Sequence, residues 1–169
     1  MEKVTREFTS KSAEETKSFA KNLAKKIKAG EIVALYGSLG AGKTTFVQGL
    51  VAGLGYEGRV FSPTFIFVRP YKLANSKHPP ARLRQANRAG KTGNRKQKGK
   101  IKTLYHIDLY RVEKETDLKT LGIEEFLADK DAASVIEWPE KIDKILPKET
   151  IKIKIEIIGE NERRIKVDE

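Results

Sequence analysis

Cysteine is absent from this chain of 169 residues, which excludes disulfide bonds and thiolate chemistry. Histidine occurs only at His78 and His106, whose spacing matches no common metal-binding pair, so a structural zinc site is not expected. No run of about 18 apolar residues is present, and the segment Met1–Arg6 lacks the apolar core of a secretory signal. We therefore expect a cytoplasmic protein that does not enter the membrane. The length favours a single domain over residues 1–169.

Acidic residues are absent from one segment, residues 72–102, which contains eleven Lys or Arg residues. The 23 basic residues outside this segment equal the 23 acidic residues of the chain, so the net charge of +11 comes from the segment alone. The segment is rich in loop-forming residues, namely Pro79, Pro80, Gly90, Gly93 and Gly99. Because it offers only three large apolar side chains, we expect a basic loop insertion at about 72–102 that cannot order itself alone.

What the chain does contain is a phosphate-binding motif. The octapeptide Gly37-Ser-Leu-Gly-Ala-Gly-Lys-Thr44 matches the pattern G-x-x-x-x-G-K-T. Its glycines let the backbone curl, so that several N–H groups point at one phosphate chain. Lys43 can reach the β- and γ-phosphates, and the Thr44 hydroxyl can bind Mg²⁺. The motif therefore predicts a nucleotide site.

The surrounding sequence predicts an α/β fold. The short apolar run Glu31–Tyr36 is typical of a buried parallel strand, and the apolar residues from Phe46 to Leu54 recur at helical spacing. A helix is expected to open at Ser12 and to end at Gly30. Further elements are predicted as strands at 4–8, 65–68, 104–110 and 133–136, a broken helix at 118–127, and an antiparallel hairpin of strands 151–157 and 164–167.

Two carboxylates follow apolar strands. Glu137 comes directly after Ser134–Ile136, and Asp108 comes after Leu104–Ile107. P-loop proteins place at such strand ends the carboxylate that holds the Mg²⁺ shell or orients water. Either carboxylate could instead cap the turn that follows its strand. Thr64 lies where switch loops reach the γ-phosphate in nucleotide hydrolases, although an ordinary Ser-Pro turn would give the same pattern.

Five sequence blocks occur in an order that resembles the TsaE family, small bacterial P-loop ATPases of the tRNA threonylcarbamoyladenosine (t6A) pathway. The blocks are Gly37–Phe46, Ser62-Pro-Thr-Phe65, Tyr105-His-Ile-Asp-Leu-Tyr-Arg111, Leu121-Gly-Ile-Glu-Glu-Phe126 and Val135-Ile-Glu-Trp-Pro-Glu140. The resemblance implies a P-loop NTPase fold with a mixed central sheet flanked by helices. It also implies weak, Mg²⁺-dependent ATP hydrolysis that supports the TsaB–TsaD complex. That complex modifies the adenosine at position 37 of tRNAs reading ANN codons, and the ATPase would reset it between turnovers.

The resemblance also assigns site residues. Thr44 and Glu137 would bind Mg²⁺, and Asp108 would assist catalysis together with Lys43 and Glu137. The residues expected to hold ATP are Ser38, Leu39, Gly40, Ala41, Gly42, Lys43, Thr44 and Thr45. Chain near Ser12 could lie by the adenine. Trp138 matches another family position, either as a half-buried packing aromatic or as a partner contact.

One departure from the family is the basic insertion, which places 32 residues between Tyr71 and Leu104 where the family has a short hairpin connection. The insertion is either a solvated loop without a role or an electrostatic arm that holds tRNA or an acidic partner surface. Two alternative functions stay open on the sequence. A P-loop small-molecule kinase would need arginines over the transferred phosphate, and only Arg111 lies within a recognisable block. An RNA-binding module would use the basic insertion.

Overall fold

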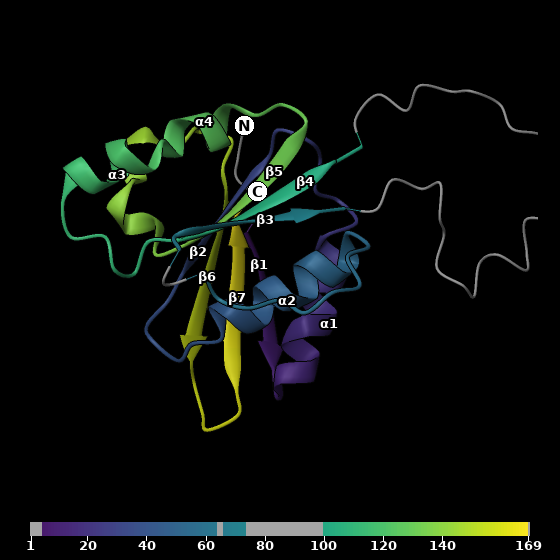
Figure 1. The fold of residues 1–169 in the computed structure, drawn as a ribbon. Coiled ribbons are helices and arrows are strands. Elements are labelled where there is room, and N and C mark those ends of the chain that lie inside the picture. Colours follow the sequence, from purple (N-terminus) through teal and green to yellow (C-terminus); the bar gives the residue numbers. More distant parts are fainter. Residues whose placement is uncertain (1–4, 64–65, 74–99, 169) are drawn as a thin grey trace, which may run out of the picture.

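The computed structural model describes residues 5–63, 66–73 and 100–168, and it contains one seven-stranded sheet with strand order β1-β7-β6-β2-β5-β4-β3 (Figure 1). The strands are β1 Thr5–Ser10, β2 Ile32–Tyr36, β3 Val68–Lys72, β4 Thr103–Asp108, β5 Ala132–Glu137, β6 Ile151–Ile157 and β7 Arg163–Asp168. The helices are α1 Ala13–Leu23, α2 Lys43–Gly53, α3 Glu115–Leu121 and α4 Ile123–Ala128, and two 3₁₀ turns follow at Pro139–Lys141 and Asp143–Ile145.

The sheet is mixed, as the family resemblance implies. Strand β2 pairs in parallel with both β5 and β6, and β5 pairs in parallel with β4. The remaining pairs, β1 with β7, β6 with β7 and β3 with β4, are antiparallel. Every residue of β2 except Tyr36 is buried, which agrees with the prediction of a buried parallel strand. The predicted C-terminal hairpin is confirmed as β6 and β7.

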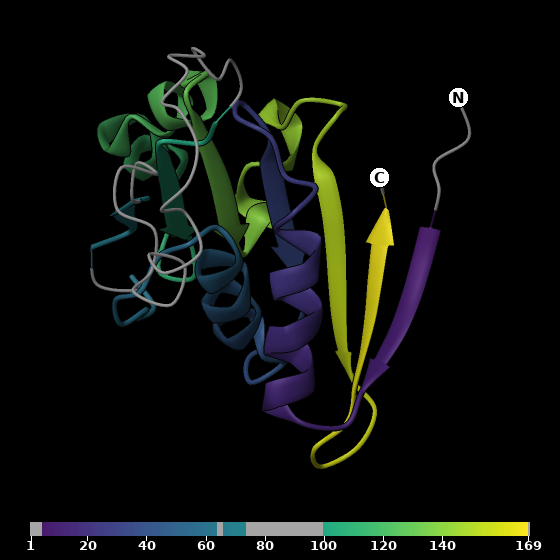
Figure 2. The same cartoon turned by 90° about the vertical axis from the view of Figure 1, so that its right-hand side faces the viewer.

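Helices cover both faces of the sheet (Figures 1 and 2). Helices α1 and α2 lie on one face, where the larger apolar core gathers side chains such as Leu23, Phe46 and Leu50. Helices α3 and α4 lie on the other face with a smaller core that includes Ile107 and Ile123. In the described part of the chain, no helix is long and apolar enough to cross a membrane.

Helix α1 begins where the capping pattern predicts. The Ser12 side chain accepts a hydrogen bond from the backbone N–H of Glu15 at 3.1 Å, and the Glu15 carboxylate accepts one from the N–H of Lys11 at 2.7 Å. The helix ends at Leu23, earlier than the predicted end at Gly30, because the next residues form a run of turns instead. Gly30 has the positive φ of +85° that favours glycine at such a turn.

The strand predicted at 65–68 is misplaced, since β3 begins at Val68 and continues to Lys72. Residues 64–65 lie outside the described residues. The backbone N–H groups of Ile66 and Phe67 both donate to the carbonyl of Pro63, and Phe67 takes a left-handed φ of +59°. This turn cannot continue a strand. The strand predicted at 104–110 likewise ends at Asp108.

The basic insertion connects two strands that pair closely. The ladder of β3 and β4 extends from Val68 opposite Ile107 to Lys72 opposite Thr103. Leu73 and Ile101, at the two ends of the predicted insertion, are buried in the core beside α1 and α2. Residues 74–99 lie outside the described residues. The insertion thus leaves the pairing of its two flanking strands intact.

Helices α1 and α2 approach each other closely through two glycines. A Cβ atom built on Gly49 of α2 would lie 2.7 Å from the Cα atom of Lys17 in α1. A Cβ atom on Gly53, one turn further along, would lie 2.5 Å from the Cβ atom of Ala24. The two helix backbones can therefore pack at this spacing only because neither position has a side chain.

Candidate functional site

The phosphate-binding motif forms the loop between β2 and α2. Gly40 and Gly42 take φ angles of +78° and +98°, which L side chains adopt with strain. A Cβ atom on Gly37 would lie 2.5 Å from the carbonyl oxygen of Ile155 in β6. The motif's glycines are thus required both by backbone conformation and by the close neighbouring strand. The loop delivers the chain to the N-terminus of α2, where unpaired N–H groups and the helix dipole favour an anion.

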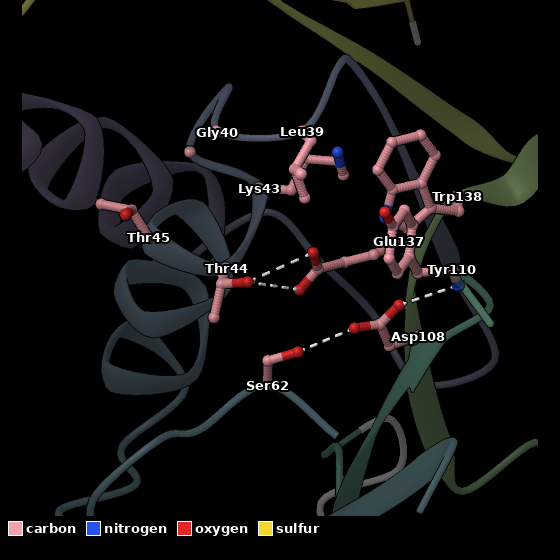
Figure 3. A pocket seen from close by; sticks show the side chains of 11 residues that line it. Leu39, Gly40, Lys43, Thr44, Thr45, Ser62, Asp108, Tyr110, Glu137 and Trp138 are labelled. Atoms are coloured by element: carbon pink, nitrogen blue, oxygen red, sulfur yellow. Dashed lines mark hydrogen bonds between the residues drawn. The ribbon is translucent and has the colours of Figure 1, made fainter. Parts of the chain in front are cut away.

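A cavity of about 310 Å³ lies at this helix N-terminus (Figure 3). It is bounded by the loop, by the strand ends of β4 and β5, and by the segment that precedes β3. Its lining residues are Leu39, Gly40, Gly42, Lys43, Thr44, Thr45, Ser62, Asp108, Tyr110, Glu137 and Trp138. Of the predicted phosphate-loop residues, Ala41 is instead fully buried, and Ser38 lines a neighbouring cavity on the other side of Trp138.

Lys43 is held against its own loop. Its Nζ atom donates to the carbonyl oxygens of Gly37 at 2.6 Å and Ser38 at 2.9 Å, and it lies 3.8 Å from the centroid of the Trp138 ring. Burial lowers the pKa of Lys43, and the carboxylates of Glu137, Glu140 and Asp108 oppose this effect. Trp138 is half-buried, so the face of its ring forms part of the lysine site.

Thr44 and Glu137 meet inside the cavity. The Thr44 hydroxyl lies 3.0 Å from Glu137 Oε1 and 3.2 Å from Oε2, and it donates to the carboxylate (Figure 3). Glu137 is the last residue of β5, and only 3% of it is exposed. On its other side, its Oε1 atom lies 2.8 Å from Nε2 of His106 in β4. The sequence predicted the pairing of Thr44 with Glu137 but not the contact with His106.

Asp108 lies next to Glu137, because the two strand-end residues are opposite each other in the parallel ladder of β4 and β5. Its Oδ1 atom accepts from the backbone N–H of Tyr110 at 3.0 Å, so the carboxylate does cap the following turn. Its Oδ2 atom accepts from the hydroxyl of Ser62 at 2.7 Å inside the cavity. The capping and site interpretations of Asp108 are therefore compatible.

Ser62 comes from the segment in which the sequence marked Thr64 as a candidate switch residue. Thr64 lies outside the described residues. The segment is fixed on its other side by Tyr71, whose hydroxyl donates to the carbonyl of Phe61 at 3.1 Å and accepts from its N–H at 3.2 Å. The segment before β3 thus reaches the cavity through the Ser62 hydroxyl.

Arg163 of β7 is a site residue that the sequence did not reveal. Its Nε atom donates to the carbonyl of Ala41 at 3.1 Å and one terminal nitrogen donates to that of Gly40 at 3.3 Å. The other terminal nitrogen donates to the carbonyls of Gly159, Glu160 and Glu162, in the turn between β6 and β7. One guanidinium group therefore joins the C-terminal hairpin to the phosphate-binding loop.

A second, smaller cavity of about 150 Å³ lies on the Arg163 side of the loop. It shares Gly40, Gly42 and Thr45 with the first cavity, and Ser12 and Thr16 at the start of α1 also line it. The sequence-based expectation that chain near Ser12 lies by the nucleotide is consistent with this position.

A parallel strand, a glycine-rich loop, a helix N-terminus and a carboxylate at the end of the adjacent strand define the protein as a P-loop nucleotide-binding protein of the α/β class. The family model described as threonylcarbamoyl adenosine biosynthesis protein TsaE matches residues 10–84 and 91–165. The chain therefore belongs to the TsaE family.

Individual relatives agree with this assignment. The tRNA threonylcarbamoyladenosine biosynthesis protein TsaE of Bacillus subtilis is 34% identical over 152 residues, which cover 90% of this chain and 78% of the relative. The protein of the same name from Treponema pallidum is 30% identical over 158 residues, covering 94% of this chain and 96% of the relative. The crystal structure of Bacillus subtilis YdiB superimposes with a TM-score of 0.69 and 28% identity, covering 99% of this chain and 87% of that one.

Proposed function

We propose that the protein is a Mg²⁺-dependent ATPase that takes part in forming t6A at position 37 of tRNAs reading ANN codons. The family membership and the names of its relatives support the pathway. The observation that carries the chemistry is the hydrogen bond between Thr44 and Glu137, because it places a hydroxyl and a carboxylate side by side next to a phosphate-binding loop. By analogy with the family, the protein acts with a TsaB–TsaD complex, which stimulates its weak hydrolysis.

The donor atoms fit Mg²⁺. This cation prefers oxygen ligands and is commonly bound through one or two carboxylates, with waters and substrate phosphates completing the shell. The Thr44 hydroxyl and the Glu137 carboxylate would hold it, and their oxygens are already in contact. When bound, the cation would neutralise charge on the β- and γ-phosphates.

The other side chains have roles that follow from their positions. Lys43 would exchange its two loop carbonyls for phosphate oxygens, since its Nζ atom already lies within the loop. Asp108 and Ser62 lie on the side of the cavity opposite the loop, where they would orient the attacking water. Backbone N–H groups from residues 38–45 would bind the phosphates.

The nucleotide assignment is tested by replacing Lys43 with Ala and measuring ATP affinity by calorimetry. We expect loss of affinity without unfolding, because the lysine supplies the phosphate contact rather than core packing. Lys144→Ala, which removes an exposed lysine at the second 3₁₀ turn, is the matched control and should bind ATP normally. Unchanged affinity in Lys43→Ala would remove the loop from the site.

The catalytic assignment is tested with Glu137→Gln, which keeps the shape but removes the charge. This variant should bind ATP but lose hydrolysis and Mg²⁺ dependence. The pathway is tested by adding a TsaB–TsaD complex and measuring both phosphate release and t6A formation on tRNA. Absence of stimulation would contradict the partnership, and faster phosphoryl transfer to a small-molecule acceptor than to water would favour a kinase instead.

A further inference from the structure

His106 is the buried histidine of the sheet beneath the proposed nucleotide site. It lies in the middle of β4 and is fully buried. Alternate residues of a strand share one face, so its side chain points to the same face as Leu104 and Asp108, the face that α1 and α2 cover. Its ring packs against that of Tyr71, with centroids 6.3 Å apart. An apolar residue would fill this position without burying a polar ring.

The hydrogen bonds of His106 are uneven. Its Nε2 atom lies 2.8 Å from Oε1 of Glu137, whereas its Nδ1 atom is buried and has no hydrogen-bond partner among the described residues. A carboxylate can only accept, so the proton between the two groups belongs to Nε2. A neutral ring with its proton on Nε2 leaves no buried N–H without an acceptor. The ring therefore has one polar partner in the described structure, and that partner is Glu137.

This contact fixes the carboxylate from the side opposite Thr44. Rotation of the Glu137 carboxylate about its last bond would break either the bond to Nε2 or the bonds to the Thr44 hydroxyl at 3.0 and 3.2 Å. Only 3% of Glu137 is exposed, so water has little access to replace a lost donor. Groups that hydrogen-bond a metal-binding side chain from behind orient it and tune its affinity for the metal.

We propose that His106 is a positioning residue for the nucleotide site, which acts by donating from Nε2 to Glu137 and holding this carboxylate toward Thr44. The proposal rests on the proposed function, because it gives the oriented carboxylate a Mg²⁺-binding role. His106 itself touches neither nucleotide nor metal.

Two amide substitutions with the same chemistry but different reach test the proposal. In His106→Gln the amide nitrogen stands three bonds beyond Cβ, as Nε2 does in histidine, whereas in His106→Asn it stands only two bonds beyond Cβ. ATP affinity is measured by calorimetry with Mg²⁺ and with EDTA, so that the readout is binding and not turnover. We expect His106→Asn to lower the Mg²⁺-dependent part of the affinity by roughly 10- to 100-fold, and His106→Gln to recover most of it. Affinity in EDTA should be the same in both variants.

A double-substitution cycle separates positioning from simple packing. If His106 acts through Glu137, then His106→Asn should have no further effect on Mg²⁺-dependent affinity in the Glu137→Gln background. Additive effects would overturn the proposal, and so would equal Mg²⁺ dependence in His106→Asn and the unchanged protein. Ser134→Ala is the matched control, because it removes a buried polar group of β5 that bonds to the carbonyl of Phe126, away from the site.

The same measurements separate this proposal from the proposed function. Glu137→Gln alone reports on the metal role of the carboxylate, and unchanged Mg²⁺ dependence in that variant would contradict the proposed function. Loss of Mg²⁺ dependence in Glu137→Gln with normal dependence in His106→Asn would overturn only the role of His106. Thermal unfolding of each variant verifies that it is folded before its affinity is compared.

Discussion

Substitution of Gly49 by Ala should destabilise the protein, although alanine is the better helix former. The new Cβ atom would lie 2.7 Å from the Cα atom and 2.8 Å from the carbonyl carbon of Lys17. Carbon atoms prefer contacts of about 3.5–4.0 Å, so α1 would have to recede by roughly 0.8 Å. The obstructing atoms are backbone, so a change of side-chain rotamer cannot relieve the clash.

Two effects of this substitution oppose each other. Overpacking of a close contact typically costs about 1–3 kcal/mol, and the contact between two helix backbones puts Gly49→Ala near the upper end. Replacing glycine within a helix contributes about 1 kcal/mol in the other direction. The net loss of unfolding free energy should therefore be about 2 kcal/mol, which lowers the unfolding midpoint by roughly 4–8 °C for a domain of this size.

Thermal and urea unfolding, followed by circular dichroism, measure this loss. The exposed Ala52 on the same helix provides the control, since Ala52→Gly should lower stability by about 1 kcal/mol through helix propensity alone. An unfolding midpoint of Gly49→Ala that equals or exceeds that of the unchanged protein would refute the packing argument. It would mean that α1 can move away from α2 without loss of other contacts.

Three further predictions concern the site and the insertion. Asp108→Asn should retain ATP affinity but slow phosphate release by roughly 10²- to 10⁴-fold, and normal release would remove Asp108 from catalysis. Arg163→Lys should weaken ATP binding by roughly tenfold in calorimetry, because an ammonium group cannot bridge the loop and the hairpin turn as the guanidinium does. Replacing residues 74–99 by a short Gly/Ser turn should leave ATP affinity unchanged and abolish salt-sensitive tRNA retention in a gel-shift assay. Equal tRNA retention at low salt would favour a solvated loop without a role.

The design of the insertion variant depends on the structure. Leu73 and Ile101 are buried in the core, and Lys72 is paired with Thr103, so removal of the whole predicted segment 72–102 would damage the sheet. The sequence marked the segment by charge, and charge alone does not show where the β-ladder ends.

Local patterns predicted most of the fold. The capping box at Ser12, the glycine-rich loop and the alternating strand Ile151–Ile157 each carry a signal within about ten residues, and each appears in the structure. The strand predicted at 65–68 failed because an apolar run has the same composition whether it extends or turns. The turn depends on the Pro63 carbonyl and on the left-handed Phe67.

The parts of the site that sequence could not predict are contacts between distant segments. Arg163 and Ala41 are 122 residues apart, and His106 and Glu137 are 31 apart. Nothing near Arg163 in the sequence marks it as different from its neighbour Arg164, which instead lies 3.3 Å from the carboxylate of Glu7. Only the order of strands in the sheet, which places β7 beside β6 and β6 beside β2, brings the Arg163 guanidinium to the loop.

Trp138 is the only tryptophan of the chain, and its ring lies 3.8 Å from the ammonium group of Lys43. The indole emission of the whole protein therefore originates beside the one lysine expected to move when phosphate binds. The protein carries an intrinsic optical probe at this position. Stopped-flow fluorescence can follow nucleotide association in real time without an attached dye, and Lys43→Ala provides the baseline for a ring that has lost its cation.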